Sequence, residues 1–162
     1  MSSRTATLLF TALAISTAVK LIAATYLVLF VAPVEEVMGV AQKIFYFHVP
    51  SAISMYFGIG MCTVASLVFL LTNRPVWDAA GKVGAELAVL YCGIVLITGP
   101  IWANEAWGSP WVWDPRLTSV AVLGLVLASY HLVRAVGEES QASRKLAAVL
   151  GVLAAPNGYL IH

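Results

Sequence analysis

The chain has 162 residues, of which 60% are hydrophobic and 10% are charged, whereas soluble domains have about 25% charged residues. Nine Lys and Arg residues nearly balance eight Asp and Glu residues, so the composition excludes a strongly basic nucleic-acid-binding protein. The charges occur in short clusters between apolar runs long enough to cross a bilayer. The sequence therefore predicts an all-α, polytopic membrane protein with a single domain, residues 1–162.

Five transmembrane helices are predicted, each of about 20 residues, because a hydrocarbon core near 30 Å requires this length. The last one contains Pro156-Asn157-Gly158, a turn signal that is expected to break the helix or end it early. The predicted spans are approximately residues 13–31, 50–71, 83–103, 116–136 and 146–161.

Lysine and arginine residues predict the orientation, because they accumulate on the cytoplasmic side of membrane proteins. Apart from Lys20, which lies within the first predicted span, Lys43 and Arg116 fall on one side and the other six on the opposite side. This distribution predicts a cytoplasmic N-terminus and places His48, His162 and residues 107–116 outside, in the periplasm or its equivalent. The residues on the predicted inner side are Arg4, Arg74, Lys82, Arg134, Arg144 and Lys145.

Several residues within the spans are expected to have structural roles. Ser54, Gly58 and Cys62 form a stripe of small residues, which predicts a close contact between the second span and another helix. Lys82 and Glu86 are four positions apart at the start of the third span and are expected to pair. Both cysteines lie in apolar runs, so neither a disulfide nor a metal site is expected from them.

Tryptophan is concentrated between the third and fourth predicted spans. The segment Trp107 to Arg116 reads W-G-S-P-W-V-W-D-P-R, and together with Trp102 it holds four of the five tryptophans of the chain. Tryptophan is common where bilayer meets water, because the indole ring is apolar and its N–H is polar. Four indoles so close together also suit a surface for a flat aromatic ligand such as haem. The density of tryptophans alone does not distinguish an interfacial belt from a surface that binds a ligand.

The same segment contains two helix-start signals. Ser109-Pro110 and Asp114-Pro115 each resemble an N-cap followed by proline at the first helical position. The first signal predicts a short helical turn that stops before Asp114, because a residue that precedes proline disfavours the α conformation. The second predicts a new helix that begins at Pro115 with Asp114 as its cap. A capping role does not exclude a role in ligand binding.

Haem iron needs an axial ligand, which is usually histidine. His48 lies in K-I-F-Y-F-H-V-P-S, just before the second predicted span, at the same outer interface as the tryptophans. The aromatic residues beside it are equally typical of an interfacial belt. His131 lies about 25 Å deeper along a helix and is not expected to reach this site. His162 returns to the outer side if the fifth span crosses fully, so it is a candidate second ligand.

Two further features bear on how haem would be held. Haem propionates pair with cations, and the two predicted outer cations, Lys43 and Arg116, flank the two candidate motifs. The chain contains no C-x-x-C-H sequence, so it is not expected to attach haem covalently. Haem bound here would therefore be held noncovalently, as haem b is.

Both motifs resemble those of a known family. Residues 107–119, W-G-S-P-W-V-W-D-P-R-L-T-S, resemble the tryptophan-rich "WWD" signature of the membrane haem-handling proteins of cytochrome c maturation. Residues 43–52, K-I-F-Y-F-H-V-P-S-A, resemble the segment that carries the first periplasmic haem-ligand histidine in the haem exporter protein C family. The motifs occur in the family's order and at a similar spacing. The resemblance extends from about Val34 to Ala148.

The resemblance implies a non-enzymatic protein of the bacterial inner membrane that binds haem on the periplasmic face. It would deliver this haem to a membrane-anchored haem chaperone during maturation of c-type cytochromes. An ATP-binding-cassette ATPase and its permease partner would form a complex with it and drive release of the loaded chaperone. His48 matches one axial ligand of the iron. The haem platform of the family matches Trp107, Gly108, Trp111, Trp113 and Asp114, and Arg116 matches the arginine that follows.

The chain departs from the family pattern in two respects. Pro110 stands where many members have another tryptophan. The family also has six spans and a second axial histidine in a W-W-x-x-L-H stretch before the sixth, which this sequence lacks. The sequence is then either a fragment or a naturally short protein. In a short protein, His162 or a partner supplies the second ligand, or haem binds weakly.

Two other classes of protein remain as alternatives. A cytochrome c haem lyase would use the same signature, although such relatives usually have more spans and more outer histidines. A structural or permease-like subunit would use its tryptophans as an interfacial belt. It would purify without a haem Soret band, which distinguishes it from a haem-binding protein.

Overall fold

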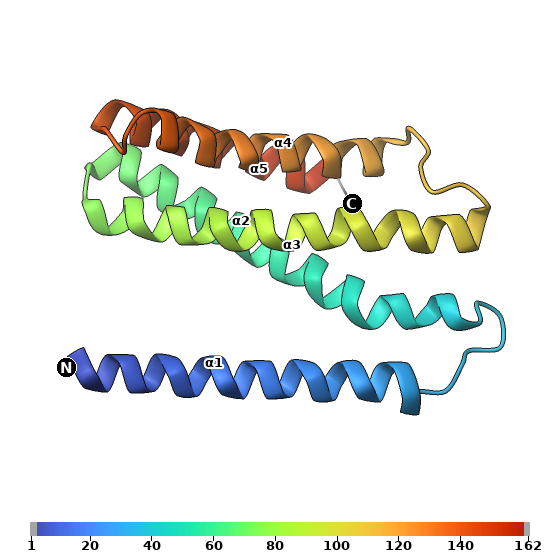
Figure 1. Cartoon of the computed structure of the whole chain (residues 1–162). Helices are drawn as coiled ribbons and strands as arrows, with labels where there is room; N and C mark the ends of the chain where they lie inside the picture. Colours follow the sequence, from blue (N-terminus) through green and yellow to red (C-terminus); the bar gives the residue numbers. More distant parts are fainter. Residues whose placement is uncertain (1–2, 161–162) are drawn as a thin grey trace. The chain divides into compact units, whose positions relative to one another are not determined.

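The computed structural model of the chain describes residues 3–160, with side chains up to Gly158. This part of the chain is helical with no β-strand, which confirms the all-α prediction. The chain divides into two compact units, residues 1–46 and 47–162, which are described separately. The helices are α1 (Ser3–Tyr26), the π-helix η1 (Leu27–Val31), the 3-10 helix η2 (Val40–Ile44), α2 (Phe45–Thr72), α3 (Pro75–Trp107), α4 (Pro115–Val136) and α5 (Gln141–Leu160) (Figure 1).

The first unit contains α1, η1, the turn that follows and η2. The π-helix η1 continues α1 directly. In the turn that follows, the Glu35 carboxylate accepts hydrogen bonds from the backbone N–H groups of Val37 and Met38. The Lys43 ammonium of η2 donates to the Leu29 carbonyl oxygen at 2.9 Å. This bond joins the end of the first long helical segment to η2.

The second unit packs the remaining four helices through small and apolar side chains. Tyr130, Met55, Leu123 and Leu127 are the largest of its fully buried side chains. Small residues bring helices close together. The Thr63 hydroxyl of α2 donates to the Gly151 carbonyl oxygen of α5 at 3.0 Å. Because apolar side chains gain little from leaving lipid, close packing and such bonds supply much of the association between membrane helices.

Glycine allows a close contact between α2 and α3. A Cβ atom added to Gly84 would lie 2.5 Å from the Cys62 backbone nitrogen. One added to Gly58 would lie 2.7 Å from the Ala88 backbone nitrogen. The two helices therefore approach to a distance that excludes any side chain at these positions, which confirms the predicted helix contact at Gly58 and Cys62.

Four helical segments in the described part of the chain are long and apolar enough to cross a membrane, and α5 is not among them. The first two turns of α5 contain Gln141, Arg144 and Lys145, which lower its apolar character. The predicted break at Pro156 is wrong, because α5 continues to Leu160. Proline removes one intrahelical hydrogen bond, and packing against neighbouring helices can override that local cost. The four segments are Ser3–Val31, Val40–Thr72, Pro75–Trp107 and Pro115–Val136.

Two helix boundaries differ from the prediction in ways that affect the candidate site. Helix α2 begins at Phe45 instead of residue 50, so His48 lies within the helix and not before it. The 3-10 helix η2 immediately precedes α2, so the chain is already helical when it reaches Phe45. Helix α3 extends to Trp107, so that tryptophan also lies on a helix. In contrast, α4 spans Pro115–Val136, close to the predicted 116–136.

Candidate functional site: one histidine and four tryptophans

His48 lies in the first turns of α2, against the C-terminal half of α3. Its Nδ1 atom is 2.8 Å from the Thr98 hydroxyl oxygen. A Cβ atom on Gly99 would lie 3.4 Å from His48 Cε1, so the imidazole lies against the backbone of α3. The ring is half-buried, and Nε2 makes no hydrogen bond within the described chain although it is not fully enclosed. His48 therefore presents one engaged nitrogen and one available nitrogen.

The first tryptophan pair continues along α3 from the histidine contact. Trp102 follows Thr98 by four positions, which places both residues on the same face of α3, one turn apart. The Trp102 and Trp107 rings pack edge to face, with centroids 5.0 Å apart and planes at 76°. Trp107 remains 52% exposed. The histidine contact and the first tryptophan pair thus occupy successive turns of one helix.

The chain between α3 and α4 is irregular. Gly108 ends α3 with a φ of 72°, a left-handed conformation that glycine adopts without strain. The predicted helical turn at Ser109-Pro110 is wrong. The Ser109 hydroxyl instead donates to the Trp111 carbonyl oxygen at 3.0 Å. Residues 111–113 have no regular secondary structure. The first helical hydrogen bond of α4 begins at Asp114, whose carbonyl oxygen accepts the Thr118 backbone N–H at 3.1 Å.

The second tryptophan pair lies in this irregular segment. The Trp111 and Trp113 rings also pack edge to face, with centroids 5.6 Å apart and planes at 78°. Trp113 is 82% exposed, so nearly its whole ring is available to a ligand. The Trp111 Nε1 atom is buried and has no hydrogen-bond partner among the residues described. An indole donor left without an acceptor costs free energy, which an anionic ligand group could offset.

The predicted polar site residues have different surroundings. Asp114 caps α4 as predicted, since its Oδ1 atom accepts the Leu117 backbone N–H at 2.7 Å. Arg116 is exposed in the first turn of α4 and has no ion-pair partner in the described part of the chain. Lys43 belongs to the first unit and already donates to a backbone carbonyl. His162 lies outside the described residues.

His131 is a packed residue within α4. Its ring is half-buried and lies edge to face with Tyr130, with centroids 5.3 Å apart. The Nε2 atom is buried and finds no hydrogen-bond partner in residues 3–160. His131 follows the start of α4 by about 16 residues, or about 24 Å of helix, so it lies far along α4 from the tryptophan segment.

Sequence reasoning missed a charged cluster at the opposite end of α3. The predicted Lys82–Glu86 pair is wrong, because the Lys82 ammonium pairs with Glu139 at 2.9 Å. The Arg134 guanidinium also pairs with Glu139, at 2.6 Å, and with the buried Asp78 carboxylate. This cluster begins about 20 residues before Thr98, which corresponds to about 30 Å along α3.

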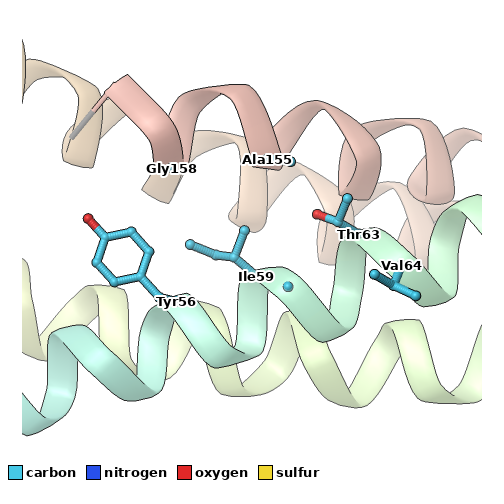
Figure 2. Close-up of a pocket in the computed structure, with 7 residues that line it drawn as sticks. Tyr56, Ile59, Thr63, Val64, Ala155 and Gly158 are labelled. Carbon is cyan, nitrogen blue, oxygen red and sulfur yellow. The ribbon is translucent and has the colours of Figure 1, made fainter. Parts of the chain in front are cut away.

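A shallow apolar groove lies between α2 and α5, away from the histidine and the tryptophans. No charged residue, histidine or cysteine is among the residues that line it. It therefore offers no imidazole or thiolate that could bind iron. Figure 2 shows Tyr56, Ile59, Thr63 and Val64 of α2 opposite Ala155 and Gly158 of α5.

Comparisons with known proteins agree with this combination of helices and motifs. The family described as "Heme exporter protein C" matches residues 1–161. "Heme exporter protein C" of Bradyrhizobium diazoefficiens is 39% identical over 127 residues, which cover 78% of this chain and 48% of that protein. The Rhodobacter capsulatus protein of the same name is 36% identical over 121 residues, covering 75% of this chain and 50% of that protein.

A more distant relative gives the same result. "Heme exporter protein C" of Escherichia coli is 30% identical over 135 residues, which cover 81% of this chain and 54% of that protein. The chain thus spans about half the length of these relatives. The family match, however, covers nearly all of the chain. The chain therefore belongs to the heme exporter protein C family.

Proposed function

We propose that this protein binds haem b at the outer ends of α2 and α3 and hands it to a membrane-anchored haem chaperone during maturation of c-type cytochromes. Its chemistry is ligation and transfer of haem, not catalysis of a covalent step. The names of its relatives describe haem export, and related mitochondrial proteins are named for cytochrome c biosynthesis. Haem is thus cargo that must be held firmly enough to be oriented and loosely enough to be released.

One observation carries this proposal: the His48 imidazole lies beside the tryptophan-bearing end of α3 with Nε2 available. Its contact with Thr98 uses Nδ1. Imidazole Nε2 is a common axial ligand of haem iron. The tryptophan Trp102 is one helical turn away on the same face of α3. Iron ligation and contact with an aromatic ring can therefore come from neighbouring elements of the second unit.

The tryptophan segment fits the rest of a porphyrin. Its exposed indole rings, above all Trp113, offer flat apolar surface, and covering such a ring releases water from one of the largest side chains. The unpaired Trp111 N–H and the exposed Arg116 guanidinium are donors suited to the propionates. Gly108 and Asp114 would fix the two ends of this segment, while Lys43 and His162 remain proposed contributors.

The charge distribution supports a periplasmic position for this site in the bacterial inner membrane. Lys82, Arg134 and Arg144 gather around the Asp78–Glu139 cluster, far along α3 from His48. Basic residues favour the cytoplasmic side, so the opposite end of α3 faces out. Within that membrane, we propose that an ATP-binding-cassette ATPase and its permease partner act with this protein to release the loaded chaperone.

The test measures Soret absorbance per mole of protein for the full chain purified from membranes in detergent. We expect His48→Ala and Trp113→Ala to lower haem occupancy. The matched control His131→Ala should not, because this imidazole is packed against Tyr130 far along α4. Equal haem content in all three variants would contradict the site.

A second measurement separates delivery from synthesis. Copurification of a membrane-anchored haem chaperone that requires bound haem is the expected result. Covalent attachment of haem to apocytochrome c by the purified chain alone would instead identify a lyase. A colourless wild-type protein that cannot be loaded with added haem would instead indicate a structural subunit that does not bind haem.

A further inference from the structure

We infer that Thr98 is a positioning residue that selects the tautomer of His48 and holds its ring in the orientation needed to bind iron. This inference rests on the proposed function, because it concerns how the same histidine is prepared for haem. Thr98 lies in the apolar sequence L-I-T-G-P, 50 positions after His48. No local pattern in the sequence links the two residues, and their contact exists only in the folded second unit.

The hydrogen bonds of Thr98 determine which atom is the donor. A threonine hydroxyl has one hydrogen and two lone pairs. The Thr98 hydroxyl donates to the Ile94 carbonyl oxygen, one turn earlier on α3, at 2.8 Å. Its oxygen is also 2.8 Å from His48 Nδ1. Because the hydroxyl hydrogen is used on Ile94, the oxygen accepts, and the His48 Nδ1–H donates.

This arrangement fixes the opposite nitrogen as the ligand atom. A neutral imidazole with its proton on Nδ1 carries its lone pair on Nε2. Haem iron needs such a lone pair, and a hydrogen bond from the other N–H orients a ligating ring and makes it more basic. Nε2 has no competing partner in the described chain and keeps access to its surroundings. The Ile94–Thr98–His48 chain thus prepares an unliganded imidazole for iron.

The geometry of the ring is also fixed from α3. A Cβ on the neighbouring Gly99 would come within 3.4 Å of His48 Cε1, so the ring lies against the helix backbone beside Thr98. The helix limits movement of the ring on one side, and the hydrogen bond limits its rotation. A threonine with a purely helical role would donate its hydroxyl to the carbonyl oxygen four residues earlier and would contact no histidine. Thr72 is such a residue, with its hydroxyl donating to the Val68 carbonyl oxygen at 2.7 Å.

The experiment compares Thr98→Val, Thr98→Ser and the matched control Thr72→Val in the full chain loaded with haem. The rate of haem transfer to apomyoglobin and the reduction potential of the bound haem are measured. Thr98→Val should release haem about 10-fold faster, the lower end of the effect seen when such orienting bonds are lost. Its potential should rise, because a less basic imidazole stabilises ferric iron less. Thr98→Ser, which keeps the hydroxyl, and Thr72→Val should match the wild type.

The outcomes separate this inference from the proposed function. If His48→Ala loses haem while Thr98→Val keeps the wild-type release rate and potential, the role of Thr98 is overturned and the haem site stands. If His48→Ala keeps wild-type haem, the haem site itself fails. If Thr98→Val does not fold, as judged by helical circular dichroism, Thr98→Ala makes the same comparison, because it removes the hydroxyl without putting a methyl group in its place. Equal behaviour of Thr98→Ala and Thr98→Ser would then overturn the inference.

Discussion

Arg134 and Asp78, 56 positions apart in the sequence, form an ion pair with two hydrogen bonds and little exposure. The Nη1 atom is 2.6 Å from Oδ1 and Nη2 is 3.1 Å from Oδ2, with the side chains 5% and 7% exposed. The pair joins the first turn of α3 to the last turn of α4. Paired donors and acceptors of this geometry are the form in which proteins tolerate buried charge.

Breaking this pair should destabilise the protein more than replacing it entirely. Asp78→Ala leaves the buried Arg134 guanidinium with one carboxylate, and such a loss costs about 3 kcal/mol. The double variant Asp78→Leu/Arg134→Leu removes both charges and should recover most of that stability. The measurement is the apparent Tm in detergent. A Tm for Asp78→Ala as high as that of the double variant would contradict this prediction.

Glu139 should make part of the stability depend on pH. Hydrogen bonds from Lys82 and Arg134 hold the pKa of its carboxyl below the ordinary value of 4.5. The unfolded chain then takes up this proton at a higher pH than the folded chain. The stabilisation is therefore complete above pH 4.5 and is lost as the pH falls through the pKa of the folded state.

The variant Glu139→Gln should accordingly lose less Tm than the wild type between pH 7 and about pH 3. Glu86→Gln is the matched control, because Glu86 is exposed and has no ion-pair partner in the described part of the chain. It should retain the wild-type acid sensitivity. If Glu86→Gln and Glu139→Gln changed the profile equally, the network would not be its source.

The contact between α2 and α3 should not tolerate a methyl group. Gly84→Ala would place Cβ 2.5 Å from the Cys62 backbone nitrogen, so the helices must separate. Overpacking of this kind costs about 1–3 kcal/mol. Gly93→Ala on the same helix meets no atom within 4 Å and should be neutral or slightly stabilising, because alanine favours helix. Apparent Tm values of the two variants in one detergent test the difference, and equal values would contradict it.

Haem affinity should depend on the position of a tryptophan and not on the number of tryptophans. Trp113→Ala removes a ring that is 82% exposed and should weaken haem binding about tenfold, since contact with an apolar ring contributes roughly 1–2 kcal/mol. Trp77→Ala removes the one tryptophan near the start of α3 and should leave affinity unchanged. Haem titration followed at the Soret band measures both. A loss of affinity in Trp77→Ala equal to that in Trp113→Ala would favour a general interfacial role.

The sequence by itself predicted features that depend on neighbouring residues. The apolar runs predicted an all-α membrane protein, because backbone groups in lipid must be satisfied within helices. Asp114 before Pro115 predicted the cap of α4, since cap and N–H donor are three positions apart. The small-residue stripe predicted a helix contact. Each of these signals is local, so no knowledge of the partner helix was needed.

Helix ends were predicted less well, for a physical reason. Ser109-Pro110 has the residues of a helix start, yet its hydroxyl bonds within the loop and no turn forms. Pro156 has the residues of a helix end, yet α5 passes through it. Local preferences for starting or ending a helix amount to about a few kcal/mol, and packing between helices overrides them when it favours another backbone conformation.

The tertiary structure alone decided which distant side chains meet. Lys82 has Glu86 one turn away but pairs with Glu139, because the loop after α4 brings that carboxylate to the start of α3. His48 meets Thr98 because α2 and α3 run side by side at glycine contacts, and this pairing leaves Nε2 available. The sequence indicated that a histidine and tryptophans could hold haem. Only the packing of α2 on α3 determined which His48 nitrogen is engaged, since Thr98, which contacts Nδ1, lies on another helix.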